Sequence, residues 1–359
     1  MATPTSLSNY NVGSQKTFMR IQILDSVAQI ESIADEWRQL LEKSASPNPF
    51  LTPEYGLAWW QHLGGGEWSS AELRVIVGHD NDNNLVGIAP LFAHEDDKNQ
   101  TTLMFLGSHE ISDFLDIIAK PEDLFEFIAS VFAFLSSQDC PTWHILDLYN
   151  LLEESATLQQ LEEISSKLDW TCEIDKLQAA PLISLPDTWD NYLLNQLSKK
   201  QRHELRRKLR KASNHVVPVD WQIVEDEQMI DVTLAALFEL MKQDPAKQAF
   251  LTEAMQAQIT TIAKAAAKHG WLQMAVLTVG NERAAIHLNF DYDNRIWGYN
   301  SGVDTRFREL SPGVVLLGNV LEHSIDSGRE VFDFMRGDEQ YKYRLGAIDR
   351  FVYRATIQK

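Results

Sequence analysis

The sequence predicts an α/β (α+β) protein built from two tandem domains, in which sheets are flanked by helices. With 359 residues the chain is long for a single core and sufficient for two. Each half contains two helical patterns, a run of strand patterns separated by polar turns, a further helix and further strands. The period of this repeat is far too long for a solenoid, so a duplicated α/β unit explains it better.

The first half is expected to begin with a strand at 18–24 and an amphipathic helix at 26–43, whose apolar residues recur at helical spacing. Thr52, Pro53 and Glu54 predict the start of a second helix, because they supply a hydroxyl N-cap, a proline in the first turn and an acid beside it. Further strands are predicted at 72–77, 85–92, 101–106, 114–119 and 144–148, and further helices at 122–135 and 153–168.

The second half follows a boundary between Pro181 and Pro186 and opens with a basic helix at 187–212. Its other predicted elements are helices at 229–242, 250–269 and 311–327, a three-strand meander at 271–279, 283–290 and 295–301, and strands at 331–335 and 351–356. The expected organisation is therefore a flexible N-terminus (1–18), an N-terminal domain (19–183) and a C-terminal domain (184–359).

The formal net charge of −19 argues against generic binding of nucleic acid, because the field of the whole protein repels phosphate. No DNA partner is therefore expected. The charge is uneven, however, because residues 199–211 hold eight of the 32 lysines and arginines and have a net charge of +7. Such a run is typical of a solvated helix face. It also suits the phosphates of coenzyme A (CoA), an anionic glycan or the acceptor stem of a transfer RNA, and the sequence leaves these open.

Cysteine usage and hydropathy indicate the compartment. Cys140 and Cys172 lie in no CxxC or Cys/His cluster, which favours a reducing compartment and argues against a metal site. The first twenty residues lack the apolar core of a signal peptide, and no later stretch approaches the ~20 apolar residues that cross a bilayer. We therefore expect a cytoplasmic protein with no transmembrane segment and no metal cofactor.

Several blocks of sequence resemble the CelD-type branch of the FemAB-like GNAT acyltransferases. In the second half these blocks are 306–313 (RFRELSPG) and 331–346 (VFDFMRGDEQYKYRLG), and in the first half they are 49–55 (PFLTPEY), Trp59-Trp60, 85–91 (LVGIAPL) and 112–116 (SDFLD). The resemblance covers the chain from about Trp37 onward. It implies two tandem GNAT-like domains, each a mixed, mainly antiparallel sheet flanked by helices. It also implies an acyl donor such as acyl-CoA and, often, a role in polysaccharide or envelope biosynthesis.

The candidate donor site lies at the predicted start of helix 311–327. GNAT enzymes usually cradle the CoA pyrophosphate in a Gln/Arg-x-x-Gly-x-Gly/Ala loop, which this sequence lacks; the nearest equivalent is 308–313. Ser311 and Gly313 open a helix whose first N–H groups and dipole favour an anion, and Arg308 adds a positive charge. Arg336 is a fourth candidate for holding a phosphate or carboxylate. The alternative is that Ser311 and Pro312 are simply a good N-cap pair.

Candidate catalytic residues follow from alternation along the strand at 283–290. Ile286, Leu288 and Phe290 share one face, which leaves His287 and Asn289 together on the other. The unperturbed imidazole pKa of ~6.5 suits His287 to take a proton from an amine near neutral pH. A half-buried, hydrogen-bonded histidine is the alternative, and Tyr299 on the next strand is expected to position a substrate group or to pack.

A polar run follows the predicted strand at 331–335, where α/β folds place their chemistry. The family resemblance implies that Asp338, Tyr341 and Lys342 are functional. Asp338 or Glu339 could orient an ammonium group or act as base, and Lys342 could hold a phosphate or carboxylate. A solvated loop with local ion pairs is the alternative.

The leading functional hypothesis is an N-acyltransferase that moves an acyl group from acyl-CoA, acetyl-CoA foremost, to an amine. The acceptor is expected to be a small molecule or glycan, such as an amino sugar or an envelope or polysaccharide precursor. Direct transfer is expected because neither cysteine lies in a nucleophile-like context. One alternative is a Fem-type transferase that uses aminoacyl-tRNA, which the basic segment favours and the net charge disfavours. The other is a non-catalytic GNAT-fold binding or scaffold protein, which the missing phosphate loop favours.

Overall fold

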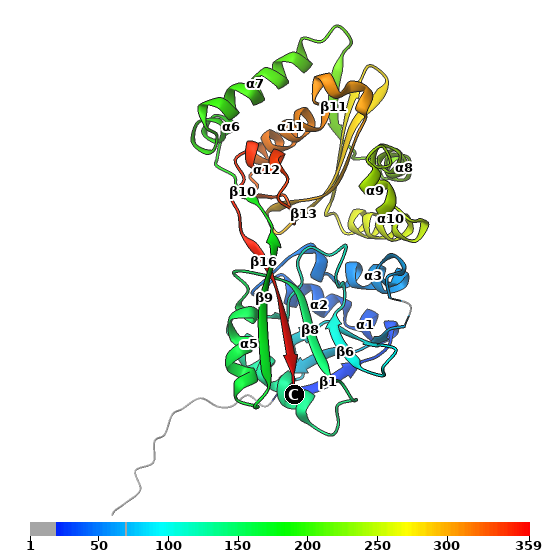
Figure 1. Ribbon diagram of the computed structural model, residues 1–359, viewed down its shortest axis with the longest axis vertical. Helices are drawn as coiled ribbons and strands as arrows, with labels where there is room; N and C mark the ends of the chain where they lie inside the picture. The colour runs from blue at the N-terminus through cyan, green and yellow to red at the C-terminus, as the bar shows by residue number, and fades with distance from the viewer. Residues whose placement is uncertain (1–18, 69) are drawn as a thin grey trace, which may run out of the picture.

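The computed structural model describes residues 19–68 and 70–359, so the predicted flexible segment 1–18 lies outside the described residues. Two lobes follow one another along the long axis, with the first half (19–183) below and most of the second half above, except for the C-terminal strand, which lies in the lower lobe (Figure 1). The helices are α1 (Val27–Ser32), α2 (Ala34–Leu41), α3 (Pro53–Gly66), α4 (Leu124–Ser136), α5 (Ala156–Ser166), α6 (Trp189–Asn191), α7 (Lys199–Ser213), α8 (Ile230–Met241), α9 (Pro245–Phe250), α10 (Glu253–Lys268), α11 (Pro312–Asp326) and α12 (Gln340–Arg344). No helix in the described ranges is both long and apolar enough to cross a membrane.

The strands form three sheets. They are β1 (Arg20–Leu24), β2 (Glu72–Leu73), β3 (Val75–His79), β4 (Leu85–Ala89), β5 (Leu91–Glu95), β6 (Thr101–Phe105), β7 (Ile118–Ala119), β8 (Ile145–Leu152), β9 (Thr171–Ala179), β10 (Leu182–Ser184), β11 (Val219–Ile223), β12 (Leu272–Val279), β13 (Glu282–Tyr292), β14 (Arg295–Val303), β15 (Val331–Asp333) and β16 (Phe351–Gln358). Most neighbouring strands in the described part of the chain are antiparallel, and β6–β8 and β14–β15 are the parallel pairs there. The predicted fold class, mixed sheets flanked by helices, is confirmed.

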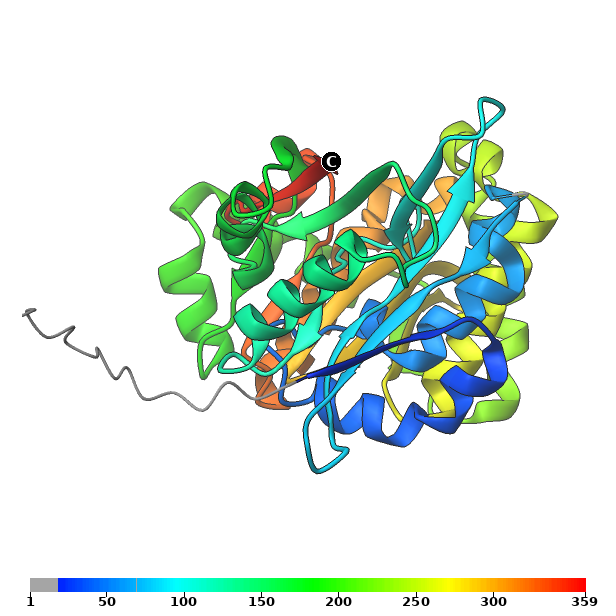
Figure 2. The ribbon, with the colours of Figure 1, turned by 90° about the horizontal axis from the view of Figure 1, so that it is seen from below.

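The first half divides its strands between two sheets, with the orders β1-β3-β4-β7 and β2-β5-β6-β8-β16-β9. The predicted single strand at 85–92 is wrong: Pro90 separates β4 from β5, and these two strands belong to different sheets. Proline has no N–H to donate to a ladder, so a strand tends to end there. The strand predicted at 114–119 is also mostly irregular, with only Ile118–Ala119 paired. Figure 2 shows this half from below, with β1 in dark blue at a sheet edge.

The second half holds one six-stranded sheet of order β10-β15-β14-β13-β12-β11, whose centre is the predicted meander. In addition, one strand from near each half's end belongs to the sheet of the other half. The predicted last strand occurs as β16, but it lies between β8 and β9 of the first half (red in Figure 1), and β10 pairs with β15 of the second. The predicted boundary after residue 183 thus falls inside β10. Val352 and Ile357 of β16 are fully buried in the first-half core.

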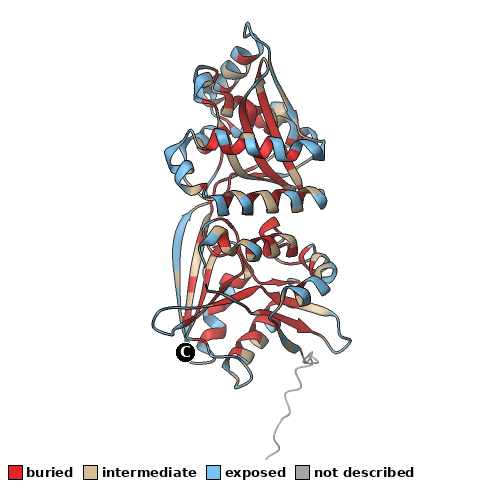
Figure 3. Cartoon of the chain, turned by 90° about the vertical axis from the view of Figure 1, so that its right-hand side faces the viewer, coloured by how far each residue is buried: buried red, intermediate tan, exposed pale blue. Residues whose placement is uncertain are grey.

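The two lobes meet where α3 packs against α10 (blue and yellow in Figure 1). A Cβ added to Gly65 would lie 2.6 Å from Met255 Cε, which shows how close this approach is. His62 Nε2 lies 2.9 Å from Thr261 Oγ1 across the same contact. One hydrophobic core runs through both lobes here, and Figure 3 shows buried residues in the sheets of each. The halves are therefore packed together rather than merely linked.

The predicted basic helix 187–212 is interrupted. Leu197 is extended (φ −107°, ψ 132°), and α7 begins afresh after Ser198, whose side chain accepts from the Gln201 N–H while the Gln201 side chain accepts from the Ser198 N–H. This capping box restarts the helix. One side of α7 nevertheless faces the core, because a Cβ on Gly318 of α11 would lie 3.3 Å from methyl groups of Leu205 and Leu209.

The predicted helix 250–269 begins later, at Glu253, with Thr252 as its N-cap. A short helix, α9, precedes it and was not predicted. It begins at Pro245, and the Asp244 side chain accepts hydrogen bonds from the N–H groups of Ala246 and Lys247. Aspartate followed by proline is a good helix start, so the signal was present in the sequence.

Candidate functional site

The candidate site lies where β14 and β15 diverge. Their parallel pairing joins only Arg295–Trp297 to Val331–Asp333, and beyond Gly298 the two chains separate. Three adjoining cavities lie along this divergence. They are a polar cavity of about 170 Å³ that His287, Asn289 and Tyr299 line, an apolar cavity of about 340 Å³ that Val303, Pro312 and Leu317 line, and a basic cavity of about 550 Å³ that Lys200, Lys208 and Arg344 line. Tyr341 lines all three.

The polar cavity contains the predicted pair on β13. His287 and Asn289 both line it, whereas Ile286 and Leu288 are buried in the core on the other face, so the predicted alternation is confirmed. Asn289 is buried and donates a hydrogen bond to Gln273 Oε1 at 3.0 Å. Asn289 is thereby held in place, with its own carbonyl oxygen not used in that bond.

Tyr299 enters the same cavity through a β-bulge. Leu288 pairs with Asn300 and Asn289 pairs with Gly298, so Tyr299 is the extra residue on β14. A bulge re-aims a side chain relative to regular alternation. The Tyr299 hydroxyl is buried without a hydrogen-bond partner among the described residues, and burial raises its pKa. Periodicity alone could not place it.

His287 is 8% exposed and lines both the polar and the apolar cavity. Burial, followed by the positive charge of Lys247, lowers its pKa to about 4. The imidazole is therefore neutral near pH 7 and free to accept a proton, but it is a weaker base than the unperturbed value suggests.

This pKa shift predicts how stability depends on pH. The unfolded chain protonates residue 287 below about pH 6.5, whereas the folded protein does so only near pH 4. The folded state thus binds fewer protons in this window, and stability should fall by about 3 kcal/mol between pH 7 and 4 on account of this residue. Urea unfolding of the natural protein and of His287→Gln across this range checks it. Between pH 7 and 4 the natural protein should lose about 3 kcal/mol more stability than the variant, and parallel curves would contradict the prediction.

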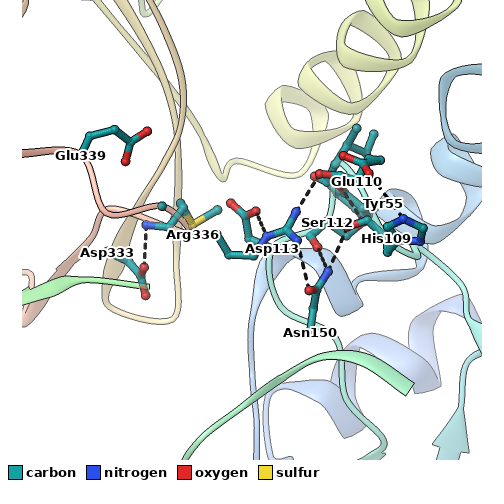
Figure 4. A network of polar contacts seen from close by, with 12 residues as sticks. Tyr55, His109, Glu110, Ser112, Asp113, Asn150, Asp333, Arg336 and Glu339 are labelled. Carbon is teal, nitrogen blue, oxygen red and sulfur yellow. Dashed lines mark hydrogen bonds and ion pairs between the residues drawn. The ribbon is translucent and has the colours of Figure 1, made fainter. Parts of the chain in front are cut away.

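Arg336 is engaged by the other half of the chain (Figure 4). Its Nε donates to Asp113 Oδ1 at 2.5 Å, Nη1 to Asn150 Oδ1 at 3.1 Å and Nη2 to the Glu110 carbonyl at 2.7 Å. Its guanidinium group therefore joins the two halves. These protein partners take three of its five N–H donors, so the structure gives Arg336 a role between the two halves, and its expected contact with a phosphate or carboxylate of a ligand stays a prediction.

Lys342 is likewise engaged. It is 2% exposed, and its Nζ donates to the carbonyls of Met335, Arg336 and Gly337 at 3.2, 2.8 and 3.0 Å. Glu339 Oε2 lies 2.9 Å from the same nitrogen. The ammonium group thus braces the turn that follows β15, and it has no donor left for the predicted phosphate or carboxylate.

The acidic candidates separate at this turn. Glu339 lines the polar cavity, whereas Asp338 is exposed and lines a different hollow together with Lys176 and Asp349. Gly337 lies between β15 and these two acids. Its φ of +106° is a conformation that turns the chain sharply. The structure therefore does not bring Asp338 together with the other predicted site residues, and Glu339 is the carboxylate that does face them.

The predicted donor residues do come together. Arg308, Ser311 and Gly313 line the apolar cavity with His287 and Tyr341. Ser311 precedes α11 but is left-handed (φ 53°) and its side chain caps nothing, so the simple N-cap alternative does not describe it. The N-terminus of the 15-residue helix α11 thus opens on a cavity that His287 and Tyr341 also line.

The basic cavity adds residues that the predicted site lacked. Lys200 and Lys208 come from α7, whose charge run was the available signal, and Arg344 lies within the 331–346 block. Glu204 is the acid among the lining residues, and Arg207 and Lys208 already pair with it. The cavity therefore presents an excess of positive charge and suits a phosphorylated group.

A possible metal-ligand group lies away from these cavities. Ligand atoms of Glu67, His109 and Glu110 lie within 4.8 Å of one another. Burial, followed by the charge of Glu110, raises the pKa of Glu67 to about 7. None of the three lines the polar, apolar or basic cavity among the residues described.

Comparison with known proteins identifies the fold around the three cavities. Residues 199–343 match the family model described as an acetyltransferase (GNAT) domain. No curated protein sequence matches the chain. A crystal structure of FemX is similar with a TM-score of 0.65 at 10% identity, covering 90% of this chain and 95% of that one.

Two further solved structures are similar over nearly their whole length. A conserved protein of unknown function from Bacteroides thetaiotaomicron VPI-5482 has a TM-score of 0.61 at 13% identity, covering 95% of this chain and 100% of that one. The C-terminal domain of a putative lysylphosphatidylglycerol synthetase from Agrobacterium fabrum has a TM-score of 0.53 at 10% identity, covering 92% of each chain. At these identities the likeness concerns the fold alone, and it extends over both halves of the chain.

Proposed function

We propose that this chain is an N-acyltransferase that moves an acyl group from acyl-CoA, acetyl-CoA foremost, directly to an amine of a small molecule or glycan. An amino sugar or a polysaccharide or envelope precursor is the acceptor class that the sequence resemblance suggests. The observation that carries the proposal is that Tyr341 lines the basic, apolar and polar cavities at once. Phosphates, acyl arm and acceptor can therefore meet at one side chain. The unpaired thiols of Cys140 and Cys172 support a cytoplasmic location.

The proposed donor binds along two of the cavities. Its phosphates contact Lys200, Lys208 and Arg344, with the N-terminus of α11 nearby. Its thioester arm lies in the apolar cavity, between Val303 and Leu317. The polar cavity, which Asn289 and Glu339 line, then receives the acceptor amine. This arrangement holds the reacting atoms together and replaces their water shell with protein groups.

In the proposed reaction the amine nitrogen attacks the thioester carbonyl carbon, a C–N bond forms, and the C–S bond then breaks. His287, which is neutral, takes the proton that the nitrogen loses. Partial desolvation, followed by the charge of Glu339, raises the pKa of Tyr341, so its hydroxyl is protonated near neutral pH. In the proposed reaction this hydroxyl gives its proton to the leaving thiolate. Proton exchange through solvent restores both residues.

Direct transfer fits the position of the thiols. Neither Cys140 nor Cys172 lines the three cavities in the described part of the chain. Burial raises the pKa of both thiols, which leaves little thiolate to act as nucleophile.

Calorimetric titration with acetyl-CoA tests the donor. The double variant Lys208→Gln/Arg344→Gln should bind at least ~10-fold more weakly than the natural protein, because two charge-assisted contacts to phosphate are lost. Arg206→Gln/Arg210→Gln is the matched control, since both of its arginines are exposed on α7 and neither lines the basic cavity. Equal affinity of the two double variants, or no binding at about millimolar concentration, would sink the donor assignment.

Three exposed basic residues of α7 favour a second candidate function, transfer from aminoacyl-tRNA. They are Lys199, Arg206 and Arg210, and the fold also resembles that of FemX. The control variant now becomes the informative one. If tRNA is the donor carrier, Arg206→Gln/Arg210→Gln should weaken binding and flatten its dependence on salt, with each lost phosphate contact reducing the slope by about one. Binding of acetyl-CoA without transfer to any amine would favour the non-catalytic alternative.

A further inference from the structure

Lys247 reaches the polar cavity from α9, the short helix that the sequence did not predict. The Asp244 cap and Pro245 set the start of this helix and so place Lys247 in its first turn. The lysine lines the cavity together with His287 and Glu339. It belongs to none of the predicted catalytic or binding residues, and the proposed reaction does not use it.

The contacts of Lys247 leave its charge without a counter-ion. Its Nζ donates to the Ser301 carbonyl at 2.5 Å and lies 3.4 Å from Ser301 Oγ. It forms no ion pair with any residue in 19–68 or 70–359, although the charges of Asp244 and Glu339 act on it from further away. Burial lowers the pKa of Lys247, so holding the charge here costs free energy.

Every other charge facing this cavity is already compensated. Asp113, from the first half, pairs with Arg336, and Glu339 pairs with Lys342. His287 is neutral near pH 7. The charged groups that line the polar cavity therefore cancel one another except for Lys247, which leaves one positive charge. A partly desolvated cation in a neutral cavity is a ready partner for an anion that enters with the substrate.

We propose that Lys247 determines acceptor specificity by binding an anionic group, a carboxylate or a phosphate, on the amine that enters the polar cavity. This inference rests on the proposed function in one respect, the assignment of the polar cavity to the acceptor. The hydrogen bond to the Ser301 carbonyl anchors the ammonium group, and its remaining donors bind the anion. An uncharged amine finds no partner for this lysine and should bind more weakly.

Titration without any acyl donor tests the proposal. Two matched pairs of probes separate the anions: L-alanine against L-alaninamide for carboxylate, and glucosamine 6-phosphate against glucosamine for phosphate. The natural protein should bind the anionic member of one pair at least ~10-fold more tightly than its uncharged partner. Lys247→Gln keeps an N–H donor for Ser301 but removes the charge, so it should lose that preference. Lys247→Arg should retain it.

Lys242→Gln is the matched control, because this neighbouring lysine pairs with Glu239 and does not line the polar cavity. Thermal melting should show all variants folded. Any of three results would overturn the proposal. They are equal binding within both pairs, no binding of any probe at about 10 mM, and a Lys247→Gln effect that is the same for charged and uncharged probes. A rate loss for all amines alike, with the acid limb of the pH profile displaced, would make Lys247 a base instead and would also overturn it.

The same measurements distinguish this proposal from the proposed donor. Loss of the anionic preference in Lys247→Gln, in a protein that does not bind acetyl-CoA, would leave the anion site standing and remove the acyl-CoA reaction. Binding of acetyl-CoA without any discrimination between the paired amines would do the reverse.

Discussion

Replacing Arg336 with methionine should lower the free energy of unfolding by about 3–5 kcal/mol, because it leaves a largely buried carboxylate without its partner. Asp113 has a side chain that is 15% exposed and loses its ion pair with Arg336 Nε at 2.5 Å. Asn150 and the Glu110 carbonyl lose their donors in the same step. Because Arg336 belongs to the second half and its three partners to the first, the lobes should also separate more easily (Figure 4).

Chemical denaturation measures the loss, and Arg207→Met provides the matched control. Arg207 makes a two-point contact with Glu204, at 3.0 and 2.8 Å, but the two side chains are 50% and 48% exposed and both lie on α7. A pair this exposed should contribute little to stability. The double variant Arg336→Met/Asp113→Asn should recover part of the loss, because the unpaired charge is then removed. Losses of similar size for Arg336→Met and Arg207→Met would contradict the account.

Replacing Lys342 with methionine should cost about 3 kcal/mol or more, because three inward-facing carbonyls lose their shared donor. Those carbonyls belong to Met335, Arg336 and Gly337, the residues that carry the chain from β15 to the side chains lining the cavities. The turn should loosen, so amide hydrogens at 337–341 should exchange faster with solvent. The proposed acyl transfer should then fall together with stability, because Glu339 and Tyr341 lose their support.

Lys167→Met is the control for this lysine. Lys167 pairs with Glu163 at 2.7 Å, but both side chains are more than half exposed, and its loss should cost about 0.5 kcal/mol or less. A Lys342→Met protein with unchanged stability and weakened binding of acetyl-CoA would support the original expectation of a phosphate ligand and would falsify the bracing role.

Much of the local structure could be predicted because its causes are local. The N-cap at Thr52 accepts a hydrogen bond from the Tyr55 N–H at 3.2 Å, as the residue types at 52–54 indicate. The meander follows from alternation and from the turns at its ends, and the same alternation places His287 beside Asn289. The capping box at Ser198 and the helix start at Asp244 were equally readable in the sequence, but the continuous charge run and the apolar spacing hid them.

Other features depend on segments that are far apart in the chain. Arg336 was assigned to a ligand because its partner Asp113 lies 223 residues away, and no local pattern connects them. The pKa of His287 depends on burial by α11 and on Lys247, neither of which the strand itself reveals. The split at Pro90 had a local cause, but the assignment of β4 and β5 to different sheets did not.

The sequence by itself therefore determined the identity and order of most helices and strands, the fold class, and the shared face of His287 and Asn289, because periodicity and capping act over a few residues. Only the tertiary structure decided that β16 returns to the first half, that the three cavities lie where β14 and β15 diverge, and that Glu339 rather than Asp338 lines the polar cavity. The tertiary structure also decided which lysine and arginine side chains have a charged partner. Arg336 and Lys342 are compensated by partners that packing brings to them, whereas no carboxylate within 19–68 or 70–359 forms an ion pair with Lys247.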